Sequence, residues 1–358
     1  MIYFLDETKC QEDELKTAET ELDTELLAHY CKEQVDKLPQ DEVTTLFKQQ
    51  ARLHQALWRE SKGYPIGSQP MRPESKANPR LKDKPKPKAK PRQLGSRIDL
   101  ESAKQSKANF LNEEVRQAVR DRLANPQPHQ TLNEDRLYAD LLSSMPMCFN
   151  LFGVLQADLE LADRAVHTWW PDVPGRVCAV LFEWSPGRRL EGEYLENRSA
   201  FDVAFELELP GNKRGVLGVE TKYHEDCKAE KVPSDERRKR YLKVARESGV
   251  FKESAFEKIM GTDLQQIWLD HLLALSMTQH PKKPWSWAGF VLVHPARNPS
   301  YARACTNYLT HLNDTSSIRV STLESLLAAK VLPPALSTAF TDRYLAFEKI
   351  DKLLKTNS

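Results

Sequence analysis

Residues 200–223, AFDVAFELELPGNKRGVLGVETKY, contain two runs rich in apolar side chains that are separated by a short polar segment. The segment holds the sequence Pro-Gly-Asn at 210–212, and these residue types favour tight turns. The pattern predicts a β-hairpin made of residues 200–209 and 215–223. The run RVCAVLFEW at 176–184 predicts another strand ahead of the hairpin, so three strands follow one another along the chain.

The segments on either side of these strands have the patterns of helices and of one more strand. Residues 136–143 and 146–170 predict helices ahead of the strands, because their apolar side chains recur at helical spacing. After the hairpin, residues 263–278 and 301–312 predict helices, and the short apolar run at 289–294 predicts a strand between them. The order of helix, three strands, helix and strand indicates an α/β sandwich with a mixed sheet.

Charged side chains stand near the ends of the two hairpin strands. Asp202 lies early in the first strand, and Glu220 and Lys222 lie at the end of the second. Because side chains along a strand alternate between faces, Glu220 and Lys222 point the same way and Thr221 points the opposite way. Pairing of the two strands would bring Asp202 close to Glu220. Two converging carboxylates form a site for a hard divalent cation, for which Mg²⁺ is the natural candidate and Mn²⁺ a substitute.

A cation and a lysine placed in this way match the requirements of phosphodiester hydrolysis. The cation can polarise a phosphate oxygen and help to deprotonate water, while Lys222 supplies a fixed hydrogen-bond donor. Because neighbouring carboxylates keep an amine protonated, we expect Lys222 to act as an electrostatic clamp rather than as a base. The alternative for Asp202, Glu220 and Lys222 is a cluster of surface salt bridges on an edge hairpin.

The overall composition is that of an ordinary water-soluble protein. The chain has 358 residues, of which 40% are hydrophobic and 29% are charged, so it is long enough for two or three structural units. No apolar run reaches the roughly 18 residues that cross a bilayer, and the start of the chain does not have the pattern of a signal peptide. The six cysteines are far apart and form no zinc-binding pair. We therefore expect a cytoplasmic protein with reduced cysteines.

Two segments in the first quarter of the chain have opposite charge. Residues 1–25 contain nine Asp or Glu and two Lys, whereas residues 72–92 contain nine Lys or Arg and two acids. The second segment alternates lysine with proline, which keeps a chain extended, and we expect it to bind the phosphates of a nucleic acid. A soluble linker is the alternative. The residues predicted to contact nucleic acid are Lys82, Lys84, Lys86, Lys88, Lys90 and Arg92.

Helical patterns surround the basic segment, at residues 17–59 before it and at 106–123 after it. Together with the charge pattern, they divide the chain into four parts. These parts are an acidic head with a helical N-terminal region (1–70), a basic Lys/Pro-rich strap (71–95), a helical connector (96–130) and the α/β domain (131–350).

Several longer stretches carry a family resemblance. They are ARLHQALWRESKGYPIG (51–67), QLGSR (93–97), LLSSMPMCFNLFG (141–153), FEWSPGR (182–188), NRSAFDVAFE (197–206), VETKYHED (219–226) and LQQIWLDHLLAL (264–275). These stretches resemble the PD-(D/E)xK nuclease superfamily, and within it a bacterial family of restriction-endonuclease-like proteins. The resemblance implies the αβββαβ core of that superfamily and covers roughly residues 45–350. The basic strap and the acidic head depart from the family pattern.

The resemblance also implies roles for the residues at the ends of the hairpin strands. Asp202 would be the first acid of the motif, Glu220 the second acid and Lys222 the lysine. The main-chain carbonyl of Thr221 would be a further metal ligand. Related nucleases use a helical glutamine to steady the lysine or the substrate, and Gln266 is the candidate for this role. A polar residue at a helix end is the alternative for Gln266.

Two further polar residues near the strands are accessory candidates. His224 directly follows the motif and would extend the site, although residues just past a strand commonly lie on a loop surface. Glu183 lies at the end of the strand at 176–184 and would orient Arg188 or Lys222. Buried ion pairing and metal binding are the two alternatives for Glu183.

These features together predict a metal-dependent DNA endonuclease that takes part in bacterial restriction or anti-phage defence. Double-stranded DNA is the expected substrate, and the protein partner is a second copy of the chain or a member of a defence complex. Two alternatives stay open. One is a non-catalytic nucleic-acid-binding or scaffold subunit that keeps the nuclease fold, and the other is an effector that cuts DNA or RNA only when a partner activates it.

Overall fold

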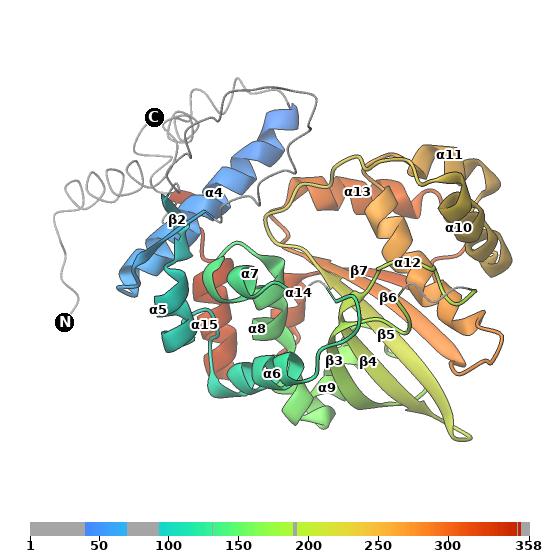
Figure 1. Cartoon of the computed structure of the whole chain (residues 1–358), viewed down its shortest axis with the longest axis horizontal. Coiled ribbons are helices and arrows are strands. Elements are labelled where there is room, and N and C mark those ends of the chain that lie inside the picture. The colour runs from blue at the N-terminus through green and yellow to red at the C-terminus, as the bar shows by residue number, and fades with distance from the viewer. Residues whose placement is uncertain (1–39, 70–92, 131, 189–191, 349, 352–358) are drawn as a thin grey trace, which may run out of the picture.

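The computed structural model of the chain describes residues 40–69, 93–130, 132–188, 192–348 and 350–351 (Figure 1). The acidic head and the six residues predicted to contact nucleic acid lie outside this part of the chain. What the sequence predicts for them therefore stays a prediction.

A five-stranded mixed sheet forms the centre of the described structure. Its strands lie side by side in the order β3-β4-β5-β6-β7. β3 pairs antiparallel with β4 and β4 with β5, whereas β5, β6 and β7 are parallel. The strands are β3 (Arg176–Trp184), β4 (Phe201–Leu209), β5 (Lys213–Thr221), β6 (Trp287–His294) and β7 (Ile318–Thr322). The predicted α/β fold with a mixed sheet is confirmed, and β7 is an additional strand that the sequence patterns do not predict.

The turn between β4 and β5 has the geometry that its residues favour. Gly211 and Asn212 have positive φ angles of 76° and 56°, which glycine and asparagine adopt more readily than other residues. The two strands pair from this turn as far as Val203 and Val219. Beyond these two residues the ladder ends, so both strands can present side chains to one site.

Helices cover both faces of the sheet (Figure 1). The helices of the first face are α8 (Ser144–Ala157) and α9 (Leu159–Trp169), and those of the second face are α10 (Asp235–Ser248), α11 (Phe256–Ile259), α12 (Gln265–Thr278) and α13 (Pro299–Leu309). The side chains of β5 alternate accordingly. Leu217 and Val219 belong to the core of the first face, whereas Val216 belongs to the core of the second.

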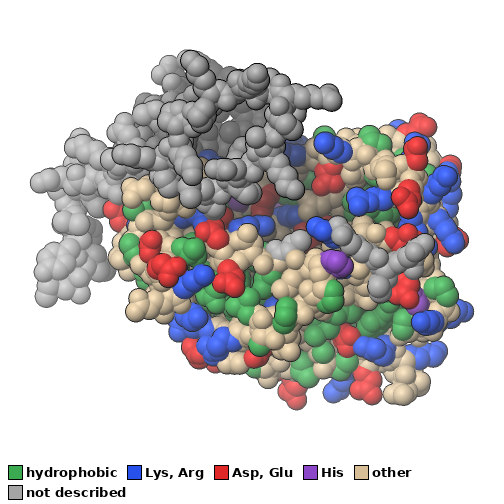
Figure 2. Space-filling model, in the orientation of Figure 1, with side chains coloured by type: hydrophobic (Ala, Val, Ile, Leu, Met, Phe, Trp, Pro, Cys, Tyr) green, Lys and Arg blue, Asp and Glu red, His purple; other side chains and the backbone are tan. Residues whose placement is uncertain are grey.

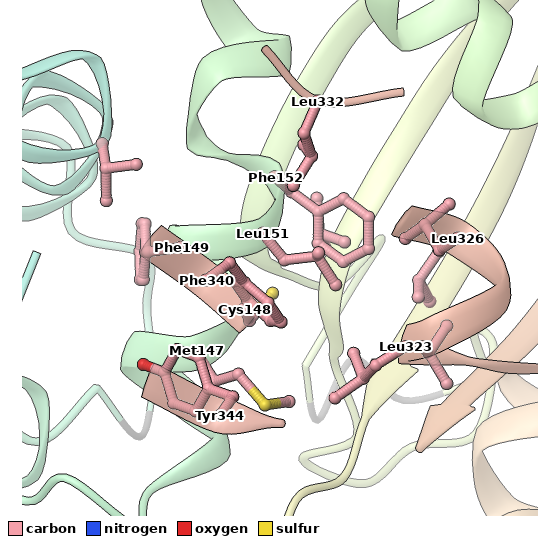
Figure 3. Close-up of a cluster of buried hydrophobic side chains, with 14 of the residues drawn as sticks. Met147, Cys148, Phe149, Leu151, Phe152, Leu323, Leu326, Leu332, Phe340 and Tyr344 are labelled. Atoms are coloured by element: carbon pink, nitrogen blue, oxygen red, sulfur yellow. The ribbon is translucent and has the colours of Figure 1, made fainter. Parts of the chain in front are cut away.

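The core of the first face extends well beyond the sheet. Figure 3 shows side chains of α8 gathered with those of α14 (Leu323–Ala328) and α15 (Pro334–Tyr344). The long helix α4 (Gln40–Ser61) adds Phe47 and Leu53 to the same core. The described parts of the N-terminal region and the connector therefore pack on the α/β domain.

Capping residues set the ends of several helices. The helical pattern at 106–123 becomes a helix only in α6 (Glu113–Ala124), because Asn112 caps it by accepting a hydrogen bond from the Val115 N–H. Asp158 divides α8 from α9 in the same way, since it accepts a hydrogen bond from the Leu161 N–H. The helix predicted at 136–143 is observed as α7 (Glu134–Ala139), which begins two residues earlier and ends four residues earlier than predicted. The remaining elements are β1 (Ile66–Ser68), β2 (Gln93–Ile98), α5 (Leu100–Ser106) and the 3₁₀ turn η1 (Glu253–Ala255). In the described ranges, no helix combines the length and the apolar character needed to span a membrane.

Candidate active site

The ends of β4 and β5 bring Asp202 to the residues of the motif. Asp202 Oδ2 accepts hydrogen bonds from the Thr221 backbone N–H at 2.9 Å and from the Thr221 hydroxyl at 2.6 Å. On the other side of the chain, the Lys222 N–H donates to the Val293 carbonyl of β6 at 2.9 Å. Because the N–H and C=O of one strand residue point to the same side, the Thr221 carbonyl also points towards β4. The gap beyond the end of the β4–β5 ladder thus receives a carboxylate and a carbonyl oxygen.

A glycine in β5 helps to set the position of Asp202. The ring of Phe201 lies against Gly218, where an added Cβ atom would be 2.3 Å from the ring. Phe201 and Ala204 both belong to the core on the α12 face, although residues three apart in a regular strand point to opposite faces. The alternation is therefore broken next to Asp202, which is turned towards the end of β5.

Glu220 and Lys222 form a buried ion pair. The Lys222 Nζ lies 2.6 Å from Glu220 Oε1, and Lys222 and Glu220 are only 7% and 8% exposed. The Lys222 ammonium also lies 5.8 Å from the centre of the Tyr301 ring, whose face attracts a cation. Burial favours the neutral amine, but the negative charge of Glu220 and smaller contributions from other neighbouring groups together outweigh burial and hold the pKa of Lys222 well above its usual value. Lys222 is therefore a fixed positive charge.

The carboxylates of this site suit a divalent cation. Burial raises the pKa of Asp202, and burial together with the neighbouring Asp202 raises the pKa of Glu220 well above its usual value. A cation between two such carboxylates would relieve their mutual repulsion. Among the described residues, no three His, Cys, Asp or Glu side chains form a complete metal cage. A cation here would be held by Asp202, Glu220 and the Thr221 carbonyl with water in its other positions, a shell that Mg²⁺ tolerates.

A carboxylate that the sequence interpretation missed lies on the helix facing this site. Asp270 of α12 is 8% exposed, and its buried Oδ2 atom receives no hydrogen bond from any residue that the structure describes. Burial raises the pKa of Asp270 to about 7, although Lys222 opposes this change. Asp270 in turn raises the pKa of both Glu220 and Lys222, so the three charges influence one another. The signal in the sequence is one acid in the largely apolar run IWLDHLLAL (267–275).

Gln266, the predicted helical glutamine, is connected to the lysine through Tyr301. Its Oε1 accepts a hydrogen bond from the Tyr301 hydroxyl at 3.4 Å, and the Tyr301 ring faces the Lys222 ammonium. The preceding Gln265 instead holds the loop before α12, because its side chain accepts a hydrogen bond from the Gly261 N–H at 2.7 Å. The geometry is compatible with a steadying role for Gln266, which stays a prediction.

Glu183 lies between Phe182 and Trp184 of β3, which pair with the residues of β4 on either side of Asp202. Its carboxylate forms a salt bridge of 3.2 Å with Arg188, which is the ion-pair alternative that the sequence left open. The negative charge of Glu183 also raises the pKa of Asp202. Glu183 has a φ angle of 47°, which is uncommon for a residue other than glycine. Glu183 therefore orients Arg188 and adds negative charge beside the candidate metal site.

His224 forms a hydrogen bond with the segment that precedes α8. Its Nδ1 lies 2.9 Å from the Leu142 carbonyl, and burial lowers the pKa of His224, which favours a neutral ring. Its hydrogen bond ties the end of β5 to the helices of the first face. A catalytic role for His224 stays a prediction.

Comparison with known protein families identifies a match over most of the chain. The sequence profile of the PD-(D/E)XK nuclease superfamily matches residues 39–346, in agreement with the resemblance described above. Nucleases of this superfamily generally depend on a divalent metal ion. No curated protein and no solved structure matches the chain. The matched range contains every helix from α4 to α15 and all five strands of the central sheet.

Proposed function

Because the chain belongs to the PD-(D/E)XK nuclease superfamily, we propose that it is a metal-dependent endonuclease that hydrolyses the phosphodiester bonds of double-stranded DNA. The observation that carries this proposal is the group of charges at the ends of β4 and β5. There, Asp202 and Glu220 lie beside the buried ammonium of Lys222. Buried charges of this kind usually lower stability, and they are common where a site uses charge in catalysis.

In this proposal, each residue of the site has a distinct role. Asp202, Glu220 and the Thr221 carbonyl hold Mg²⁺, for which Mn²⁺ can substitute, and the bound ion would polarise a phosphate oxygen and lower the pKa of water. Lys222 donates a hydrogen bond to the phosphate or to the attacking water, and its charge stabilises the negative charge that develops there. The two hydrogen bonds from Thr221 hold the Asp202 carboxylate in place before any ion binds.

Exposed basic side chains support a nucleic-acid substrate. α10 follows the loop that leaves β5, and it presents Arg237, Arg238 and Lys239 to solvent. Figure 2 shows Lys and Arg side chains, mixed with acidic ones, along the side of the molecule where Figure 1 places α10. Such side chains bind the phosphate backbone without reading its sequence. We propose that the basic strap, which includes residues 82–92, adds to this binding.

Cleavage assays with defined substrates test the proposal. Supercoiled plasmid, linear duplex, single-stranded DNA and RNA would each be incubated with Mg²⁺, Mn²⁺ or EDTA. We expect duplex DNA to be cut only with a metal ion, and we expect Lys222→Ala to slow cutting by about 100-fold or more. Lys228→Ala is the matched control, because the Lys228 side chain lies on the loop after β5 and is 71% exposed. This control should cut like the wild type.

The other outcomes would change or refute the proposal. Cutting of RNA but of no DNA form would change the substrate. No cutting of any substrate would refute an independent nuclease and favour a scaffold subunit or an effector that needs a partner. We also propose a role in bacterial restriction or anti-phage defence, in which two copies of the chain act together. Phage plaque counts on cells that express the wild type or Lys222→Ala test this role.

A further inference from the structure

The roles proposed above give Glu220 two partners. In the structure, its Oε1 binds the Lys222 ammonium at 2.6 Å, and in the proposed function the same carboxylate binds a metal ion. A bound ion offsets the negative charge of Glu220, so it weakens the attraction between Glu220 and Lys222. Lys222 is 7% exposed, and a buried ammonium without an acceptor is strongly disfavoured. Lys222 therefore needs a second acceptor in the metal-bound site.

α12 holds a suitable acceptor across from β5. The Asp270 carboxylate is buried, and its Oδ2 atom receives no hydrogen bond from the residues in the described ranges. Glu220 and Lys222 lie on the face of β5 that packs against α12, and the negative charge of Asp270 raises the pKa of both. An unpaired buried carboxylate is as unfavourable as an unpaired buried ammonium. An ion pair between the Asp270 carboxylate and the Lys222 ammonium would give both buried charges a partner.

We propose that Asp270 is a positioning residue that receives the Lys222 ammonium when a metal ion engages Glu220. This inference rests on the proposed function. In the metal-free protein, Lys222 is paired with Glu220, and in the metal-bound protein it is paired with Asp270 and stays in the site. The Tyr301 ring lies 5.8 Å from the Lys222 ammonium and attracts this ammonium in both arrangements. Gln266 holds the Tyr301 hydroxyl at 3.4 Å and so helps to keep this ring in place.

Two other roles for Asp270 lead to different expectations. If Asp270 attracts or binds the metal ion directly, its removal weakens metal binding whether or not Lys222 is present. If Asp270 only stabilises the fold, its removal lowers the stability of the metal-free protein. The proposed role predicts that the effect of Asp270 on metal binding depends on Lys222 and that the metal-free fold does not need Asp270.

A double-mutant cycle on metal binding separates these roles. Calorimetric titration with Mn²⁺ would compare the full-length wild type, Asp270→Asn, Lys222→Met and the double variant. We expect Asp270→Asn to weaken Mn²⁺ binding by about fivefold in the wild type and by no more than about twofold in the Lys222→Met background, since coupled residues give non-additive effects of this size. Asp263→Asn, which changes an exposed acid just before α12, is the matched control and should leave the affinity unchanged.

Each outcome of the cycle supports or overturns the proposal. Equal weakening in both backgrounds would overturn it in favour of direct action on the ion, and no weakening in either would also overturn it. A lower melting temperature of metal-free Asp270→Asn, relative to Asp263→Asn, would assign Asp270 a structural role instead. If Asp270→Asn binds Mn²⁺ and cuts DNA like the wild type, the inference alone fails. If the wild type binds no Mn²⁺, the proposed function fails together with the inference.

Discussion

Replacement of Gly218 by alanine should disable the site without changing any of its charged residues. Asp202 follows Phe201, whose ring packs on Gly218 at a place where a Cβ atom would be 2.3 Å from the ring carbon Cε1. Carbon atoms in ordinary contact are about 3.5 Å apart, so the ring has to retreat by about 1 Å. It has little room, because Phe201 is fully buried and the rings of Trp184 and Phe290 lie beside it, with centroids at 6.5 and 6.4 Å.

The size of the expected effect follows from this displacement. Overpacking of a core costs about 1–3 kcal/mol of unfolding free energy, and a shift of about 1 Å at a catalytic group lowers a rate by about 100-fold. We therefore expect Gly218→Ala to unfold at lower urea concentration and to cut plasmid about 100-fold more slowly than the wild type. Adding Phe201→Leu makes room for the new methyl group and should restore part of both losses.

Two results would contradict the prediction for Gly218→Ala. Wild-type stability and wild-type cleavage by Gly218→Ala would refute the close packing on which it depends. Loss of cleavage that Phe201→Leu does not improve would refute the connection between the ring and Asp202. Calorimetric titration with Mn²⁺ is the accompanying measurement, because a displaced Asp202 should also weaken metal binding.

Three further predictions concern a buried histidine, the basic strap and Gln266. Burial lowers the pKa of His271 from 6.5 to about 3, so between these pH values the unfolded chain binds a proton at this histidine and the folded chain does not. The stability that depends on the neutral His271 is therefore complete above pH 6.5 and is lost as the pH falls towards 3. His271→Gln should make the loss of unfolding free energy between pH 7.5 and 5.0 smaller by about 2 kcal/mol in urea titrations. Replacing the six basic residues at 82–92 by glutamine should weaken DNA binding and flatten its dependence on salt, measured as the slope of log Kd against log salt concentration. Gln266→Ala removes the hydrogen bond to Tyr301 and should lower kcat about fivefold at unchanged KM, in cleavage assays with saturating metal ion.

The strands around the site could be predicted because their signals are local. The run at 176–184 coincides with β3, and the hairpin strands agree with β4 and β5 to within two residues. β7 (Ile318–Thr322) could not be predicted in this way, because IRVST is short and largely polar. It becomes a strand by pairing with β6, and that contact depends on the fold rather than on its own sequence.

The site itself could be predicted only in part, for the same reason. The spacing of Glu220 and Lys222 along one strand is enough to place both side chains on one face. The hydrogen bonds from Thr221 to Asp202 depend on where the hairpin ladder ends, and that end cannot be read from alternation alone. Asp270 could not be assigned to the site, because its place depends on how α12 lies across the sheet.

The site therefore combines one pair of charges from neighbouring positions of one strand with two charges that tertiary packing places beside them. Glu220 and Lys222 stay close as long as β5 is a strand, whereas Asp202 depends on the packing of β4 and Asp270 depends on the packing of α12. In the proposed function, a metal ion needs both Asp202 and Glu220 and not the local pair alone. Substitutions that loosen either packing should consequently weaken metal binding before they unfold the sheet, so metal affinity is a more sensitive measure of the intact site than stability.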